Sequence, residues 1–263
     1  MRGALTIAEL LEPLRSHPAA GAVLFDIDGT LAPIVRHASD AVVPEPTRAR
    51  LIEISKRYGT VACVSGRSAS VARQMVSIGS IAYIGNHGSE VLRAGSSEPA
   101  VDPAVAEWMP RVLSFAARVD RPALQQLRVR REDKGAIVAF HWRGAPDEGA
   151  AEVAVGALEL AAQNAGLQTH RGRKVLEIRP PAPFDKGRGI RRLLAERPPS
   201  AALYVGDDST DVDAFSGLRE AVGAGAVCVG VRSDETPAEL AAAADAMVDG
   251  TPGVRDLLDL LLR

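Results

Sequence analysis

The sequence has few cysteines, no long apolar run and little net charge. Its two cysteines, Cys63 and Cys228, fall inside predicted buried strands, where reduced thiols are usually inert. This usage excludes both as nucleophile candidates and predicts a cytoplasmic protein. The longest run of small apolar residues, 221–231, is too short and too rich in glycine to span a bilayer. Glu9 and Glu12 interrupt the N-terminal segment, so no signal peptide is expected.

Lysine is also scarce, since only four of the 31 basic residues are lysines. The net charge of −2 provides no basic footprint for binding nucleic acid. Because arginine is the default cation of this chain, a retained lysine can mark a position that needs a compact ammonium group rather than a planar guanidinium. The four are Lys56, Lys134, Lys174 and Lys186.

The stretch 22–31 joins four apolar residues to an acidic pair and a turn. Such a run is typical of a strand buried on both faces, as in a parallel sheet. Asp26 and Asp28 would then lie at the carboxyl edge of the sheet, and alternation along an extended chain would keep both carboxylates on one side. Two like charges held so close need a cation between them, and Mg²⁺ prefers such oxygen ligands. For this segment alone, an ordinary acidic turn is an equally good explanation.

Strands alternate with helices in both outer parts of the sequence, and polar residues follow the strand ends. This rhythm predicts an α/β fold with a doubly wound, Rossmann-like parallel sheet. An amphipathic helix is predicted at 5–16, and strands are predicted at 22–26, 61–64, 81–84, 202–205, 226–231 and 246–248.

The middle of the sequence follows a different pattern, α-β-β-α-β-β, which ends at a stiff proline-rich linker, 180–183. We therefore predict a core domain in two parts, 1–97 and 184–263, and an inserted cap domain, 98–183. Only two short chain segments would connect this cap to the core, and such connections suit a hinged lid. Helices of the insert are predicted at 102–119 and 147–166, and its strands at 127–132, 136–143, 167–171 and 174–179.

Four segments of the predicted core place polar groups at strand ends or helix starts. Each has an ordinary explanation: Ser65 can cap a helix, and the aspartates after 206 can form an acidic first turn. Lys186 can be a solvated first-turn residue, although a cation is unfavourable there. A single site at one edge of the sheet explains all four segments together better than the separate ordinary roles do. The segments are Asp26 with Asp28, Ser65 with Gly66, Lys186, and Asp207, Asp208 and Asp211.

Phosphoryl transfer needs these residue types. A carboxylate can attack phosphorus and form an aspartyl-phosphate, which divides one difficult step into two. Mg²⁺ and a lysine neutralise the charge on the equatorial oxygens. A second carboxylate can protonate the leaving oxygen and later deprotonate water.

At these positions the sequence resembles the haloacid dehalogenase superfamily of phosphatases. Asp26–Thr30 is similar to its first motif, and Ser65, Lys186 and Gly206–Asp208 follow in the order of the other three. The resemblance narrows to the trehalose-6-phosphate phosphatases and covers nearly the whole chain. The segments that carry it are Gly85–Glu90, Lys134–Gly135, His141–Arg143, Lys174–Pro180 and Gly206–Asp211.

The resemblance implies an Mg²⁺-dependent phosphatase that releases trehalose and phosphate from trehalose 6-phosphate through an aspartyl-phosphate. It also implies a functional link to a trehalose-6-phosphate synthase. Asp26 would be the nucleophile, Asp28 the general acid/base, and Ser65, Gly66 and Lys186 would hold the phosphoryl group. The metal set would be Asp26, the carbonyl of Asp28 and Asp207, with Asp208 and Asp211 in the next coordination shell or sharing a water. The substrate-binding set would be His87, Glu90, Lys134, His141, Arg143, Lys174 and Glu177.

Strand alternation gives a partial check on the cap. His141 and Arg143 would share one face of their strand, so that Phe140 and Trp142 can pack on the cap helices from the other. Glu177 and Arg179 would share one face of their strand, and Lys174 would lie on the opposite face.

The sequence departs from the family pattern at Val212, where GDDxTDE has a glutamate, and this affects the expected rate and metal preference. Other activities also fit the motifs: a phosphatase for sucrose or mannosyl phosphates, a phosphomutase, or a sugar-phosphate sensor without turnover. The presence of Asp26, Asp28 and Lys186 argues against a sensor, because binding alone needs no nucleophile.

Overall fold

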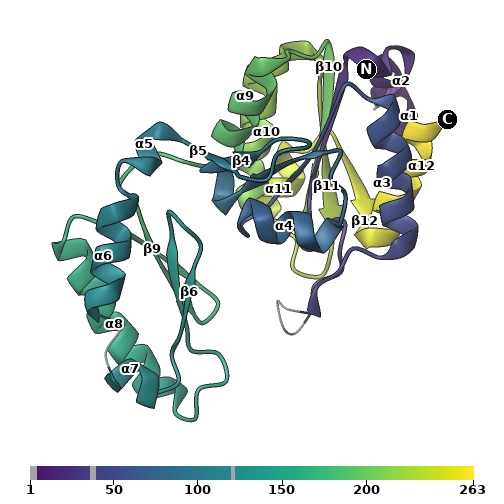
Figure 1. The fold of residues 1–263 in the computed structure, drawn as a ribbon. Coiled ribbons are helices and arrows are strands. Elements are labelled where there is room, and N and C mark those ends of the chain that lie inside the picture. Colours follow the sequence, from purple (N-terminus) through teal and green to yellow (C-terminus); the bar gives the residue numbers. More distant parts are fainter. Residues whose placement is uncertain (1–4, 36–39, 120–121) are drawn as a thin grey trace. The chain divides into compact units, whose positions relative to one another are not determined.

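The computed structural model describes residues 5–35, 40–119 and 122–263 and divides into two compact units (Figure 1). The core unit comprises Met1–Ala100 and Phe184–Arg263, and the inserted unit comprises Val101–Pro183. The expected cap begins slightly earlier, at residue 98, and ends at the same proline. Residues 1–4 and 36–39 of the expected core lie outside the described residues. Within the described ranges, no helix has the length and apolar character needed to cross a membrane.

The core unit is built on one eight-stranded sheet with the order β12-β11-β10-β1-β2-β3-β4-β5. The strands from β12 to β3 pair in parallel, which confirms the predicted doubly wound α/β core. Sequence reading missed β4, which is antiparallel to β3, and β5, because both are too short to show a pattern. The strands are β1 (Gly21–Asp26), β2 (Thr60–Val64), β3 (Ala82–Gly85), β4 (Glu90–Leu92), β5 (Ala100–Val101), β10 (Ala201–Gly206), β11 (Ala226–Arg232) and β12 (Ala246–Asp249). The helices are α1 (Ile7–Leu10), α2 (Glu12–Ser16), α3 (Glu45–Arg57), α4 (Ala69–Val76), α9 (Lys186–Glu196), α10 (Thr210–Val222), α11 (Ala238–Ala243) and α12 (Gly250–Leu262).

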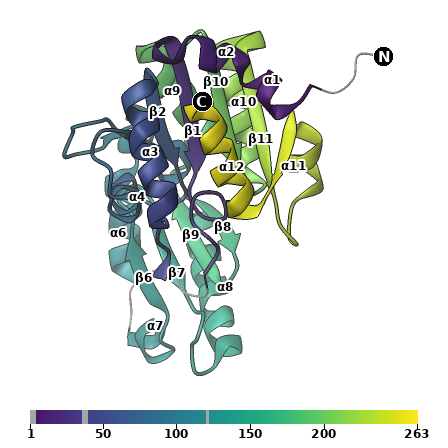
Figure 2. The same cartoon turned by 90° about the vertical axis from the view of Figure 1, so that its right-hand side faces the viewer.

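Alternate side chains of β1 enter two apolar cores, one on each face of the sheet. Val23 and Phe25 pack with residues of α3 and α12. Ala22 and Leu24 pack with residues of α9 and α10. Figures 1 and 2 show these two helix pairs on opposite faces of the sheet. Burial on both faces explains why the strand is a continuous apolar run rather than an alternating one.

Two predicted helices are divided in the structure. The one predicted at 5–16 forms α1 and α2, because Pro13 has no N–H with which to continue the first helix. The one predicted at 102–119 forms α5 (Pro103–Ala106) and α6 (Met109–Val119), with Pro110 in the first turn of α6.

The inserted unit has a four-stranded antiparallel sheet with the order β6-β7-β9-β8. Phe140 and Trp142 pack against the helices of this unit, as strand alternation predicts. His141 and Glu177 lie on the other face of the sheet, whereas Arg143 follows the end of β7. The remaining elements of the unit are α7 (Pro122–Gln126), β6 (Arg130–Asp133), β7 (Val138–His141), α8 (Glu148–Asn164), β8 (Gln168–Gly172) and β9 (Val175–Arg179).

Candidate active site

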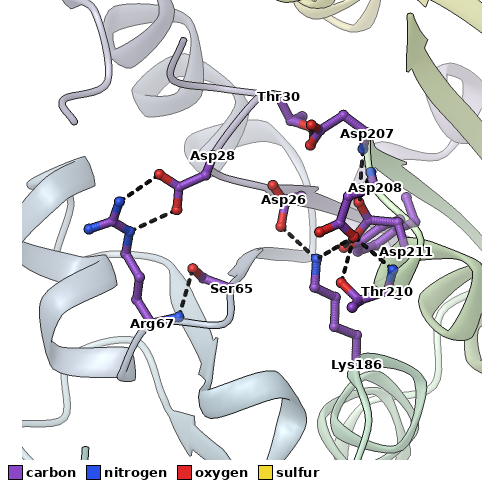
Figure 3. A network of polar contacts seen from close by, with 11 residues as sticks. Asp26, Asp28, Thr30, Ser65, Arg67, Lys186, Asp207, Asp208, Thr210 and Asp211 are labelled. Carbon is purple, nitrogen blue, oxygen red and sulfur yellow. Dashed lines mark hydrogen bonds and ion pairs between the residues drawn. The ribbon is translucent and has the colours of Figure 1, made fainter. Parts of the chain in front are cut away.

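Three buried carboxylates meet at the carboxyl edge of the core sheet. Asp26 ends β1, Asp207 follows β10, and Asp211 lies in the first turn of α10. One oxygen from each lies within 4.8 Å of the others (Figure 3). Sequence reading predicted this meeting, because parallel strands that adjoin in the sheet end at the same edge.

Lys186 lies among these carboxylates, at the first position of α9, and only 3% of the residue is exposed. Its Nζ donates to Oδ1 of Asp26 at 2.8 Å and to Oδ1 of Asp211 at 2.6 Å. Burial alone lowers the pKa of Lys186, but the neighbouring carboxylates of Asp211 and Asp26 outweigh it and raise that pKa. The ammonium therefore stays charged, which explains a cation at a helix start.

Asp211 holds the turn that presents Asp207. Its Oδ2 accepts from the backbone N–H of Asp207 at 2.8 Å and of Asp208 at 3.0 Å. Its Oδ1 accepts from Lys186 and, at 2.6 Å, from the hydroxyl of Tyr204. Asp211 thus already accepts four hydrogen bonds, so its main effect is to position neighbouring groups. Sequence reading missed Tyr204, because a tyrosine in an apolar strand looks like an ordinary core residue.

Two glycines leave room for these carboxylates. Gly29 has a φ of +93°, and a Cβ there would lie 2.0 Å from Oδ2 of Asp207. A Cβ on Gly206 would lie 2.3 Å from Cγ of Asp211. The hydroxyl of Thr30 also donates to Oδ1 of Asp207, at 3.1 Å. Any side chain at either glycine would push a carboxylate out of the cluster.

The cluster suits a divalent cation. Burial raises the pKa of Asp26 well above its usual value, even though Lys186 opposes that shift. Burial, with help from the charges of Asp211 and Asp208, raises the pKa of Asp207 to about 7. Several carboxylates thus compete for one ammonium group, and a hard cation would relieve their repulsion. Asp26 and Asp207 fit Mg²⁺ through their carboxylate oxygens.

Asp28 does not join this cluster through its side chain. Its carboxylate points to the guanidinium of Arg67, which donates to both oxygens at 2.7 Å (Figure 3). The expectation that Asp26 and Asp28 share one side was wrong for the carboxylates, because β1 ends at Asp26 and the alternation of an extended strand ends with it. Sequence reading also missed Arg67, although it directly follows Ser65-Gly66.

The expected phosphate-binding segment lies at the end of β2. Ser65 is buried, and its Oγ accepts from the backbone N–H of Arg67 at 3.1 Å. Ser68, not Ser65, caps α4, so the capping explanation for Ser65 is wrong. The ring of His87 covers Gly66, since a Cβ on Gly66 would lie 2.6 Å from Cε1 of His87.

Two other core residues have structural partners. Glu90 is buried, and its Oε1 accepts from the backbone N–H of Ala69 at 2.6 Å, at the start of α4. Burial raises the pKa of Glu90, although this hydrogen bond opposes the shift. Val212, at the position where the family pattern has glutamate, packs against the apolar core beside α10.

The predicted sugar-binding residues of the inserted unit divide into two groups. Lys134 donates to Glu177 at 2.9 Å, and Nε2 of His141 lies 2.8 Å from Oε2 of Glu132, on the same face of the sheet. Glu132 was missed, although its spacing in β6 puts it on this face. The other two residues have partners elsewhere in the unit: Lys174 pairs with Glu148, and Arg143 donates to the carbonyl oxygen of Arg173.

Residues 24–247 match the family model described as trehalose-phosphatase. A trehalose-phosphate phosphatase of Mycobacterium marinum is 36% identical over 220 residues, which are 81% of this chain and 54% of the relative. One of Mycobacterium tuberculosis is 32% identical over 247 residues, which are 92% of this chain and 61% of the relative. The chain thus spans little more than half the length of these relatives.

Solved structures share the fold. The C-terminal domain of a trehalose-6-phosphate phosphatase from Candida albicans has a TM-score of 0.72 at 22% identity, covering 98% of this chain and 97% of that one. A haloacid dehalogenase-like hydrolase from Bacteroides thetaiotaomicron has a TM-score of 0.61 at 17% identity, covering 91% and 98%. These matches extend the likeness through both units of the chain.

Proposed function

Because the chain belongs to the trehalose-phosphatase family, we propose that it hydrolyses trehalose 6-phosphate to trehalose and phosphate. The observation that carries the proposal is the buried ammonium of Lys186 between Asp26 and Asp211, next to Asp207. A nucleophile, a fixed positive charge and a set of metal ligands are the groups that phosphoryl transfer needs. A trehalose-6-phosphate synthase would then supply the substrate.

In the first step, a carboxylate oxygen of Asp26 attacks phosphorus, and the bond from phosphorus to the sugar oxygen breaks. Asp28, as the general acid, gives a proton to that oxygen, and trehalose leaves. In the second step, Asp28 takes a proton from water, whose oxygen attacks phosphorus and frees Asp26 and phosphate. Lys186, the hydroxyl of Ser65 and the amide of Gly66 hold the phosphoryl oxygens through both steps.

Asp26, Asp207 and the backbone carbonyl of Asp28 would hold Mg²⁺. When bound, the ion supplies positive charge next to the phosphoryl oxygens. Asp211 acts through the backbone of Asp207 and Asp208, whose N–H groups it binds. The carboxylate of Asp208 accepts from the backbone and the side chain of Thr210, which fixes the same turn.

The residues of the inserted unit would select the sugar. Lys134, His141 and Glu177 lie together on the face of the sheet opposite the helices of this unit, and charged hydrogen-bonding groups suit sugar hydroxyls. His87, Glu90, Arg143 and Lys174 remain in the proposed substrate-binding set through the family resemblance. The buried Glu90 would act by holding the loop of His87.

The proposal is tested by measuring phosphate release with malachite green over a panel of esters. The panel contains trehalose 6-phosphate, sucrose 6-phosphate, a mannosyl phosphate, glucose 6-phosphate and p-nitrophenyl phosphate, with Asp26→Asn as the inactive control. We expect the highest kcat/KM with trehalose 6-phosphate. A higher kcat/KM for another sugar phosphate would make that ester the substrate and leave the proposed chemistry unchanged. Binding of trehalose 6-phosphate without phosphate release would identify a sensor.

A further inference from the structure

The carboxylate of Asp28 is bound by an arginine fork instead of facing the groups of the phosphoryl site. Nε of Arg67 donates to Oδ2 and Nη2 to Oδ1, both at 2.7 Å. Two parallel charge-assisted hydrogen bonds are the strongest way in which a guanidinium binds a carboxylate or a phosphate. In the part of the chain that the structure describes, the Asp28 carboxylate makes no hydrogen bond with Asp26, Ser65 or Lys186. A carboxylate held in this way is not available as an acid or a base.

Arg67 is anchored to the segment that would bind the phosphoryl group. Its backbone N–H donates to Oγ of Ser65 at 3.1 Å, and its carbonyl accepts from the N–H of Asn86 at 2.7 Å. The pair is not locked in the core, since 21% of the Arg67 side chain and 38% of the Asp28 side chain are exposed. Its guanidinium can therefore exchange its partner for a ligand that enters from solvent.

We propose that Arg67 is a substrate-operated switch for Asp28. A phosphoryl group bound at Ser65 and Gly66 competes for the Arg67 guanidinium, takes it, and releases the Asp28 carboxylate. The released carboxylate can take up a proton from solvent, give that proton to the leaving oxygen, and then accept a proton from the attacking water. A phosphate monoester carries a charge of about −1.5 to −2 near neutral pH, so it is a stronger partner for guanidinium than one carboxylate. The inference rests on the proposed phosphatase function and adds a control: the acid/base is released only while a phosphoryl group occupies the site.

The switch makes a prediction about binding that needs no turnover. Inorganic phosphate is titrated calorimetrically into the whole chain with Mg²⁺, in the wild type, Asp28→Asn, Arg67→Met and the double variant. Asp28→Asn removes the competitor, and we expect it to bind phosphate about tenfold more tightly than the wild type. Arg67→Met removes the fork and should bind about tenfold more weakly. In the Arg67→Met background, Asp28→Asn should then change the affinity little.

The double variant separates the switch from a plain charge effect. If Asp28→Asn tightens phosphate binding equally with and without Arg67, the gain comes from the removed negative charge alone, and the switch is overturned. The switch also fails if Asp28→Asn alone does not tighten binding. A wild-type protein that binds no phosphate would overturn the phosphoryl site itself, and with it the proposed function, whereas binding with additive effects would overturn the switch alone.

A second arginine–carboxylate pair in the core unit serves as a matched control. Arg50 and Asp259 form another fork, with distances of 2.7 and 2.9 Å, between α3 and α12. Arg50→Met and Asp259→Asn make the same changes of charge as the test variants. Both should leave the phosphate affinity unchanged. Circular dichroism of all variants confirms that each is folded before titration.

Discussion

The hydroxyl of Tyr204 donates a 2.6 Å hydrogen bond to Oδ1 of Asp211, and both residues are fully buried. Burial, together with the charge of Asp211, raises the pKa of Tyr204, so the phenol remains a donor. Asp211 in turn binds Lys186 and the backbone of Asp207. One hydroxyl therefore connects the apolar strand β10 to the candidate active site.

Tyr204→Phe should lower the free energy of unfolding by about 1.5–3 kcal/mol, because hydrogen bonds to charged groups contribute that much. Urea denaturation measures the loss. Tyr83→Phe is the matched control, since the Tyr83 hydroxyl donates at 2.6 Å to a neutral carbonyl, that of Ile78. We expect about 0.5–1.5 kcal/mol for it. Equal losses of unfolding free energy in the two variants would show that the hydrogen bond from Tyr204 to Asp211 is no stronger than one to a neutral carbonyl.

Asp26→Asn should abolish turnover and keep the fold, because an amide is nearly isosteric but cannot attack phosphorus. Phosphate release and circular dichroism measure the two effects. In the wild type, beryllofluoride should bind to the Asp26 carboxylate as a phosphoryl mimic, and the variant should not bind it. A variant that keeps most of its activity would remove Asp26 from the role of nucleophile.

Removal of divalent metal should abolish activity. We expect phosphate release to stop with EDTA and to return with Mg²⁺, because Asp26 and Asp207 offer the hard oxygen ligands that this ion prefers. Ca²⁺ should restore far less, since its larger and more flexible coordination shell misplaces the nucleophile. Activity that persists after thorough chelation would contradict the metal assignment.

The metal-free protein should lose thermal stability as pH rises from about 5 to about 8. The folded pKa of Asp207, about 7, is above its unfolded value, so the protonated carboxyl stabilises the fold. That contribution is complete below about pH 4 and is lost as pH rises through 7. Since Mg²⁺ replaces the proton, it should raise Tm more at about pH 8 than at about pH 5.5. Thermal unfolding with EDTA or Mg²⁺ measures both trends, and equal Mg²⁺ shifts at the two pH values would contradict them.

Glu177→Ala should lower kcat/KM for trehalose 6-phosphate by about 10- to 150-fold, the effect of losing a charged hydrogen bond in the transition state. Hydrolysis of p-nitrophenyl phosphate should not change, because that ester has no sugar hydroxyls. Glu159→Ala is the control, since Glu159 pairs with Arg171 in the same unit. Because Lys134 and Arg179 also bind Glu177, an equal fall on both esters would mean that this residue supports the fold.

The buried cluster of carboxylates and lysine was predictable because its members follow local patterns. Asp26 ends an apolar strand, Asp207 directly follows another, and Lys186 is a cation at a helix start, where a positive charge is unfavourable. Parallel strands end at the same edge of a sheet, so strand prediction places Asp26 and Asp207 there, whereas Lys186 begins the helix α9. The alternating pattern around His141 likewise predicted which face of its strand packs on the helices.

The remaining contacts depend on distances along the chain that no local pattern reports. Thr30 and Asp207 are 177 positions apart, and Arg67 and Asp28 are 39 positions apart. The direction of Asp28 depends on where β1 ends, which periodicity locates only to within a few residues. Tyr204 has the pattern of a core residue, and only its hydroxyl partner reveals its second role.

The position of β1 between β2 and β10 has a consequence for folding while the protein is synthesised on the ribosome. Leu24 pairs with Ala62 on one side and with Tyr204 on the other. The first partner is made soon after β1, but the second follows only after the whole inserted unit. Until then β1 has an open edge, to which other chains or chaperones can bind. Asp26 therefore has no Asp207 beside it until the inserted unit and β10 have been synthesised, and only then can the candidate active site form.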